Sequence, residues 1–173
     1  MKRIVALCTA AVLCLSLLSA CSGNNKSDSP SQAPGRDVGL AAFAQTVQEN
    51  HEFTALDRCD PEDDGVGAVM LGNYYPGLTD LDLEQVEIYM PMISFSGGVL
   101  ALVQATSAED AAKVKEIFQA RLDSKTVDGP GNYPEDVEMW QRSAKIADHG
   151  NYVLLVNHDD SEAIVNEFNA LFS

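Results

Sequence analysis

Two short segments of this sequence bring metal-binding residue types close together along the chain. Residues 51–55 read His-Glu-Phe-Thr-Ala, which begins like the H-E-x-x-H motif of zinc enzymes, but Ala55 stands where the second zinc-binding His is needed. Residues 60–65 read Asp-Pro-Glu-Asp-Asp-Gly, with acids at the first, third and fifth positions of a calcium loop and Gly at the sixth. The twelfth position, which supplies a bidentate carboxylate in such loops, is Leu71. We therefore predict no metal site and interpret residues 60–65 as a solvated acidic loop.

Nucleophilic catalysis needs a hydroxyl or thiol held beside a base, and no linear motif for it is present. The sequence lacks a G-x-S-x-G turn and the glycine patterns that bind phosphates or dinucleotides. His149 and His158 flank a predicted strand at its opposite ends, and either could serve as a general base. We predict no catalytic residue and no cofactor. A structure that places either His within about 3 Å of a Ser or a carboxylate, inside a cleft, would favour an enzyme.

Aromatic side chains give a hint of binding. Five aromatic residues could line a groove, since Tyr and Trp supply rigid, amphipathic contact area: Tyr74, Tyr75, Tyr133, Trp140 and Tyr152. Of these, Tyr133, Trp140 and Tyr152 form the possible binding surface. Core packing explains the same residues, because Tyr133 precedes Pro134 and must be extended, while Trp140 would face inwards from a short helix. We interpret the three residues as structural first and as a binding surface second.

The first 21 residues have the three parts of a lipoprotein export signal. A basic start, Met-Lys-Arg, precedes the uncharged apolar residues 4–18, which at about 22 Å are too short for the ~30 Å hydrocarbon core of a membrane. Residues 18–21, Leu-Ser-Ala-Cys, are similar to the bacterial lipobox, whose Cys receives a diacylglyceryl group. We predict a signal peptide over residues 1–20 and a lipid on Cys21, which would anchor the protein on the outer face of the cell membrane. A secreted protein without a lipid is the alternative.

The rest of the chain divides into a tether and one domain. Residues 21–36 are rich in Ser, Asn, Pro and Gly with almost no apolar side chain, so we predict a disordered tether of roughly 20 Å. A single domain should follow over residues 37–173. Cys59 is the only thiol in that domain, so no internal disulfide can form, and we predict a small, partly buried and unreactive side chain there.

Charge narrows the range of partners. After removal of the signal the chain would carry nine basic and 26 acidic residues, a net charge of −17. That balance argues against nucleic acid and against direct binding to anionic lipid, since both need clustered Lys and Arg. The densest basic stretch contains Lys113, Lys115, Arg121 and Lys125, but acidic residues are interleaved with it. We interpret this stretch as a solvated helix face.

Hydrophobic periodicity predicts a mixed α+β domain. Apolar residues recur at helical spacing over about 38–50, 65–75 and 108–124, in a short stretch from Pro134, and in a closing stretch with Ile164 and Phe168. Strand patterns of apolar residues occur over about 86–92, 99–103, 142–148 and 151–157. Ser107 and Asp110 have capping-box spacing at the start of one helix. The strands should pair as two hairpins in one antiparallel, four-stranded sheet with helices packed on a face.

An internal repeat is one interpretation of that order. Residues 97–104 align without gaps on residues 150–157, and an amphipathic helix follows each segment. Two ββα-like halves would then build the sheet. The alternative is that any hairpin followed by a helix looks alike, and the sequence leaves both interpretations open.

Several short motifs resemble a known family. Arg121, Tyr-Pro-Glu at 133–135, Lys-Ile at 145–146 and Gly-Asn-Tyr-Val at 150–153 look like the lipoprotein family catalogued as domain of unknown function 4358. The resemblance covers about residues 80–157, with one departure, because Gly97-Gly98 stands where an acidic residue is expected. It implies an exported, lipid-anchored α+β domain of Gram-positive bacteria with no assigned activity. Envelope-polymer acylation systems are the partner class that it implies.

We therefore predict a non-catalytic binding or accessory protein of the cell envelope, held on the membrane by the lipid on Cys21. Its partner would be an envelope protein or a wall polymer. The alternative is a small envelope hydrolase or transferase whose active site assembles from residues distant in the sequence. A two-lobed solute receptor does not fit, because one core of about 137 residues is too small for two lobes with a cleft between them.

Overall fold

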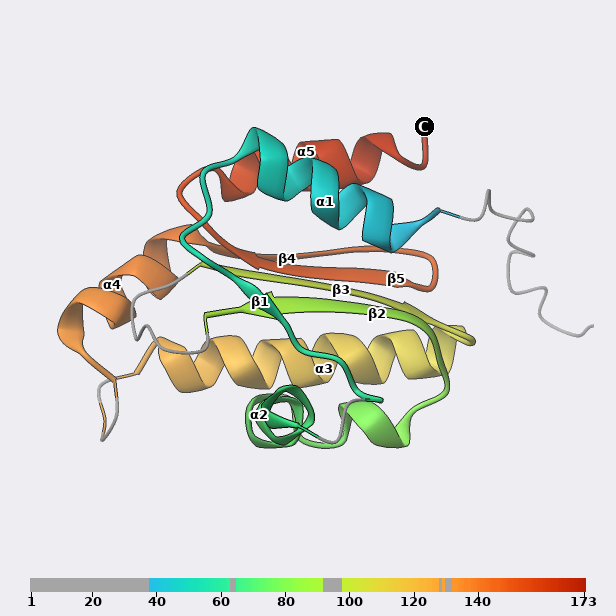
Figure 1. Ribbon diagram of the computed structural model, residues 1–173, viewed down its shortest axis with the longest axis horizontal. Coiled ribbons are helices and arrows are strands. Elements are labelled where there is room, and N and C mark those ends of the chain that lie inside the picture. Colours follow the sequence, from blue (N-terminus) through green and yellow to red (C-terminus); the bar gives the residue numbers. More distant parts are fainter. Residues whose placement is uncertain (1–37, 63–64, 92–97, 128, 130–131) are drawn as a thin grey trace, which may run out of the picture. The chain divides into compact units, whose positions relative to one another are not determined.

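The computed structural model describes residues 38–62, 65–91, 98–127, 129 and 132–173 (Figure 1). Its elements in chain order are α1 (Leu40–Asn50), β1 (Asp57–Arg58), α2 (Val66–Tyr74), a 3₁₀ turn (Leu78–Asp80), β2 (Leu83–Met90), β3 (Val99–Ala105), α3 (Ala108–Lys125), α4 (Pro134–Ser143), β4 (Ala144–His149), β5 (Tyr152–Asn157) and α5 (Ser161–Ala170). The helices and the four longer strands lie where hydrophobic periodicity predicted them. The α+β class is therefore confirmed.

Local sequence explains how several elements begin or turn. The hydroxyl of Ser107 accepts a hydrogen bond from the backbone N–H of Asp110 at 3.0 Å, so the predicted cap of α3 is confirmed. Pro134 takes the first turn of α4, where a missing N–H breaks no helical hydrogen bond. Gly150 has a φ of 58° in the tight turn between β4 and β5, a backbone conformation that favours Gly.

The strands form one antiparallel sheet in the order β1-β2-β3-β5-β4. Both predicted hairpins are confirmed, and they join through β3 and β5, where Leu102 lies opposite Leu154. The prediction of four strands was wrong, because β1 pairs with the outer edge of β2 as a fifth strand. β1 has two residues, both exposed, and so leaves no alternating pattern that the sequence could reveal.

Helices cover both faces of the sheet (Figure 1). α1 and α5 pack on one face, where Phe43 and Phe168 share a core with Leu154. α2, α3 and α4 lie on the other face, where Phe118 and Trp140 share a core with Leu155. β3 and β5 are buried along their whole length on both sides, which explains their continuous apolar sequences. The expectation of helices on a single face was therefore wrong.

The two ββα-like halves differ in the face that their helices cover. α3 follows β3 onto one face, whereas α5 follows β5 onto the other. A rotation that superimposes β2 and β3 on β4 and β5 would leave both helices on the same face. The aligned positions also change sides, because Ala101 packs in the core of Phe118 and its counterpart Leu154 packs in that of Phe168. The halves are therefore not a rotational repeat, and the shared pattern is that of a hairpin followed by a helix.

Candidate functional site

A groove of about 470 Å³ lies between α2 and α3. One wall comes from α2 and the segment after it, and the other comes from one side of α3. The lining residues are Asn73, Tyr74, Pro76, Leu81, Lys113, Glu116, Ile117, Ala120, Arg121 and Ser124. Positions 113, 117 and 121 recur every four residues, so helical geometry aligns them along one side of α3.

Arg121 is held between two aromatic rings in this groove. Its Cζ lies 4.2 Å from the centre of the Tyr74 ring and 5.6 Å from that of Trp140. Cation–π contacts at these distances stabilise a cation and fix its orientation. Burial lowers the pKa of Arg121, but a guanidinium with an ordinary pKa above about 12 keeps its charge at neutral pH. The groove therefore contains a permanent positive charge.

No carboxylate of the described residues neutralises Arg121, whose electrostatic partners are Tyr74 and Tyr75. The Nε of Arg121 is buried and has no hydrogen-bond partner in the described part of the chain. The hydroxyl of Tyr75 is also buried, in a side chain that is 1% exposed, and Arg121 is the cation that interacts with it. Buried polar groups in folded proteins are normally paired. A guanidinium that lacks a carboxylate partner can bind a carboxylate or phosphate group that a ligand supplies.

α2, which lines the groove with Asn73 and Tyr74, also exposes apolar side chains. Val66 and Val69 are each 62% exposed, and Tyr74 is 39% exposed. α2 is apolar on every side, so Leu71 enters the core while the two valines face outwards. Exposed apolar side chains grouped beside a groove are typical of surfaces that contact another protein. We call the groove and the exposed residues Val66, Val69 and Tyr74 the α2–α3 surface.

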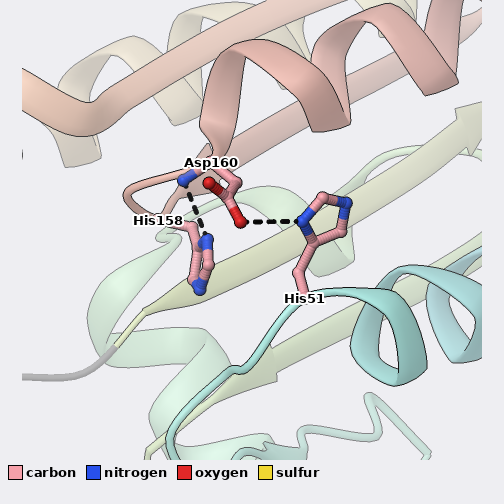
Figure 2. A group of neighbouring side chains, drawn as sticks. All are labelled: His51, His158 and Asp160. Carbon is pink, nitrogen blue, oxygen red and sulfur yellow. Dashed lines mark hydrogen bonds and ion pairs between the residues drawn. The ribbon is translucent and has the colours of Figure 1, made fainter.

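A second polar cluster lies where α1 ends and α5 begins (Figure 2). The Nδ1 of His51 lies 3.1 Å from Oδ2 of Asp160, and its Nε2 lies 3.1 Å from Oε1 of Glu167. Nδ1 of His158 accepts a hydrogen bond from the backbone N–H of Asp160 at 3.0 Å. One ligand atom from each of His51, His158 and Asp160 lies within 4.8 Å of the others. We call these three residues the His–His–Asp cluster.

The electrostatics of His51 follow from its two carboxylate neighbours. Its side chain is 9% exposed, and burial alone lowers the pKa of the imidazole. The hydrogen bonds to Asp160 and Glu167, together with the charges of these residues, outweigh burial and raise the pKa above its ordinary value. A proton on His51 therefore links the C-terminal end of α1 to the N-cap of α5 and to Glu167 within that helix.

Within the described residues, His149 and His158 make no hydrogen bond to a Ser or carboxylate side chain. His158 contacts the backbone of Asp160 and lies 3.4 Å from the carbonyl oxygen of Glu52, so neither nitrogen contacts a Ser or carboxylate side chain. His149 stacks on Phe172 with ring centres 4.2 Å apart. As predicted, His149 and His158 lie at opposite ends of the β4–β5 hairpin.

The three aromatic residues of the predicted binding surface do not come together. Tyr133 is 53% exposed at the start of α4. Trp140 is buried in the core that α3 covers, whereas Tyr152 is buried in the core that α1 and α5 cover. The hydroxyl of Tyr152 accepts a hydrogen bond from the backbone N–H of Val38 at 3.3 Å. Trp140 and Tyr152 are therefore core residues, and Trp140 also contacts Arg121, which lines the groove.

The exposure predicted for the basic residues of α3 and for Cys59 can also be compared with the structure. The interpretation of residues 113–125 as a solvated face holds for Lys113, which pairs with Glu109 and is 45% exposed. It was wrong for Arg121, which is largely buried. Cys59 is fully buried, more so than the partial burial predicted, and burial raises the pKa of its thiol to about 11.

Some predicted residues lie outside the described part of the chain. Cys21 and the whole predicted signal and tether belong to this group, as do Asp63 and Asp64 of the acidic loop. Asp60, which is described, accepts a hydrogen bond from the backbone N–H of Glu62 and pairs with Arg58. Within the described residues, no helix has the length and apolar character needed to cross a membrane.

The fold and these sites define an α+β domain that carries a cationic, aromatic-lined groove on one side and a histidine cluster on the other. A family model described as a domain of unknown function, DUF4358, matches residues 64–158, which is more than half of the chain, and the chain therefore belongs to this family. The matched region runs from α2 to β5 and includes both walls of the groove. No curated protein and no solved structure matches the chain.

Proposed function

We propose that this protein is a lipid-anchored accessory protein of the cell envelope that binds a partner protein through the α2–α3 surface. The observation that carries the proposal is Arg121, a cation held between Tyr74 and Trp140 with no carboxylate partner in the described residues. A carboxylate from a partner would supply the missing counter-charge and hydrogen bonds. The apolar residues Val66 and Val69 would contact the partner around that ion pair.

Charge favours a protein over a wall polymer as the partner. The mature chain would carry a net charge of −17, so a polyanionic polymer would be repelled from most of its surface. The repulsion on a single carboxylate of a protein segment is far weaker, because at physiological ionic strength salt screens its interaction with acidic residues more than about 8 Å away. The short-range attraction of Arg121 then decides binding.

The predicted lipid on Cys21 supports the location. Two acyl chains on one Cys hold a protein stably on a membrane, because each buried methylene contributes about 0.8 kcal/mol. A tether over residues 21–36 would keep the domain roughly 20 Å from the anchor. The α2–α3 surface could then reach membrane proteins that stand close to the outer face of the membrane.

Photo-crosslinking in cells that produce the full chain tests this proposal. A photoreactive amino acid at position 69 should yield a protease-sensitive adduct, because Val69 is exposed on α2 one helical turn before Asn73, which lines the groove. The same amino acid at position 49 is the control, since Glu49 is exposed on α1, on the other side of the sheet. Arg121→Gln should abolish the adduct from position 69, and Arg121→Lys should restore part of it because the charge remains.

Two further measurements make the result decisive. Lys115→Gln changes an exposed cation on the same helix, one that pairs with Asp148, and should leave the adduct unchanged. Thermal melting must show that Arg121→Gln is folded at the temperature of the crosslinking. Equal adducts from positions 49 and 69, or an adduct that Arg121→Gln leaves intact, would refute the proposal. A protease-resistant adduct would refute the choice of a protein partner.

A further inference from the structure

The His–His–Asp cluster unites residues that are remote in the sequence. His51 ends α1, His158 follows β5, and Asp160 precedes the first residue of α5. His51 and Asp160 are 109 positions apart, yet their side chains lie 3.1 Å from each other. Figure 2 shows the Asp160 carboxylate directed at the His51 ring, with the His158 ring hydrogen-bonded to the backbone N–H of Asp160.

We propose that this cluster binds one divalent transition metal ion of the zinc type. Two imidazoles and one carboxylate form a donor set of the kind found at zinc sites with three protein ligands, which keep a fourth position for water. Tetrahedral zinc with bonds of about 2.0–2.1 Å requires neighbouring ligand atoms about 3.3 Å apart. The separation of 3.1 Å between His51 and Asp160 is close to that value, and the third ligand atom lies within 4.8 Å.

Glu167 gives the cluster an outer carboxylate. Its Oε1 lies 3.1 Å from Nε2 of His51, while Nδ1 of the same ring faces Asp160. Metal-binding histidines usually donate their second N–H to a carboxylate or carbonyl group, which fixes the tautomer and the ring orientation. Glu167 would therefore hold the proton on Nε2 of His51 and leave Nδ1 free to bind the metal.

Asp160 and His158 are positioned for the same centre. Asp160 stands at the N-cap of α5, but its carboxylate makes no capping hydrogen bond to that helix and turns to His51 instead. The His158 ring packs on Phe53 with ring centres 4.3 Å apart, which limits its rotation. Metal binding would displace the proton between His51 and Asp160. It would also replace one of the two contacts of the His158 ring, which are with the backbone N–H of Asp160 and with the carbonyl oxygen of Glu52.

The ligand types select the ion. Imidazole nitrogens suit Zn²⁺, Cu²⁺ and Ni²⁺, whereas Mg²⁺ and Ca²⁺ prefer sites built from oxygen. The side chain of Asp160 is 59% exposed, so an ion can reach the cluster from solvent although His51 is buried. A bound ion would connect the end of α1 to the start of α5.

Metal titration of the full chain in detergent tests this proposal. The protein carries no histidine tag, and its accessible thiols are alkylated beforehand, because thiolates also bind Zn²⁺. We expect one Zn²⁺ per chain by calorimetry, a rise in melting temperature with Zn²⁺, and no effect of Mg²⁺ or Ca²⁺. Co²⁺ in place of Zn²⁺ should give the visible absorption of a tetrahedral nitrogen and oxygen site.

Variants separate the site from weak surface binding. His158→Gln and Asp160→Asn alter residues that are not in the buried core, and each should abolish binding and the melting shift. Glu167→Gln should weaken binding by about 10–100-fold, as expected for an outer carboxylate. His149→Gln is the matched control, because it removes the third His of the chain, at the far end of the hairpin. Absence of stoichiometric binding, or binding that His158→Gln and His149→Gln change equally, would overturn the proposal.

Discussion

Trp140 gives the sharpest test of how the groove side of the domain is held together. Its side chain is 3% exposed and packs in the core that contains Phe118 and Leu155. Removing a buried Phe or Trp side chain typically costs about 3–5 kcal/mol, through lost burial and the cavity left behind. Trp140→Ala also removes one of the two rings that contact Arg121. We therefore expect the free energy of unfolding to fall by about 3–5 kcal/mol, out of about 5–15 kcal/mol for a typical domain.

The assay is urea denaturation followed by far-ultraviolet circular dichroism, because Trp140 is the only Trp of the chain and its replacement removes the fluorescence signal. Glu138→Ala is the matched control, since Glu138 is exposed on the same helix, and its effect should stay within about 0.5 kcal/mol. Trp140→Phe keeps an aromatic ring in the core and should cost less than Trp140→Ala. A loss below about 1 kcal/mol for Trp140→Ala would refute the buried position of the indole.

Three further predictions concern the anchor, the thiol and a helix cap. Cys21→Ala should release the protein from the membrane fraction or leave its precursor uncleaved, and normal maturation with membrane retention would contradict the lipid anchor. Because burial raises the pKa of Cys59 to about 11, iodoacetamide at about pH 8 should modify this thiol only after urea unfolds the domain; modification of the folded chain would show an accessible thiol. Ser107→Ala should lower the free energy of unfolding by about 0.5–2 kcal/mol, because it removes the capping hydroxyl. Ser107→Thr keeps that hydroxyl and should cost less. Equal losses for the two variants in urea denaturation would contradict the cap.

The sequence predicted the fold where hydrophobic side chains recur with a clear period. β3 and β5 are aliphatic throughout, and α3 has both a cap and a buried stripe that includes Val114 and Phe118, so these elements could be located correctly. β1 could not, because Asp57 and Arg58 owe their strand conformation to pairing with the edge of β2. Which face each helix covers also depends on connections in space, which periodicity does not encode.

The candidate sites depend on contacts that the sequence does not reveal. Arg121 lies among interleaved charges, and only the packing of Tyr74 and Trp140 around it distinguishes it from the exposed Lys113. The H-E-x-x-H pattern relates His51 to residues 52–55, whereas its actual partners are Asp160, at the N-cap of the last helix, and Glu167 within that helix. A helical motif search tests contacts one turn apart and therefore misses clusters that the tertiary fold assembles.

The sheet keeps the two proposed sites apart. Arg121 belongs to the face that α3 covers, whereas His51 and Asp160 lie at the ends of helices on the other face. Between them, β3 and β5 are buried on both sides, and interiors of this kind are close-packed. A ligand in the groove and a metal ion in the His–His–Asp cluster would therefore share no contacting residue. Substitutions at distant sites without shared partners act additively, so Arg121→Gln and His158→Gln test two independent properties of one domain.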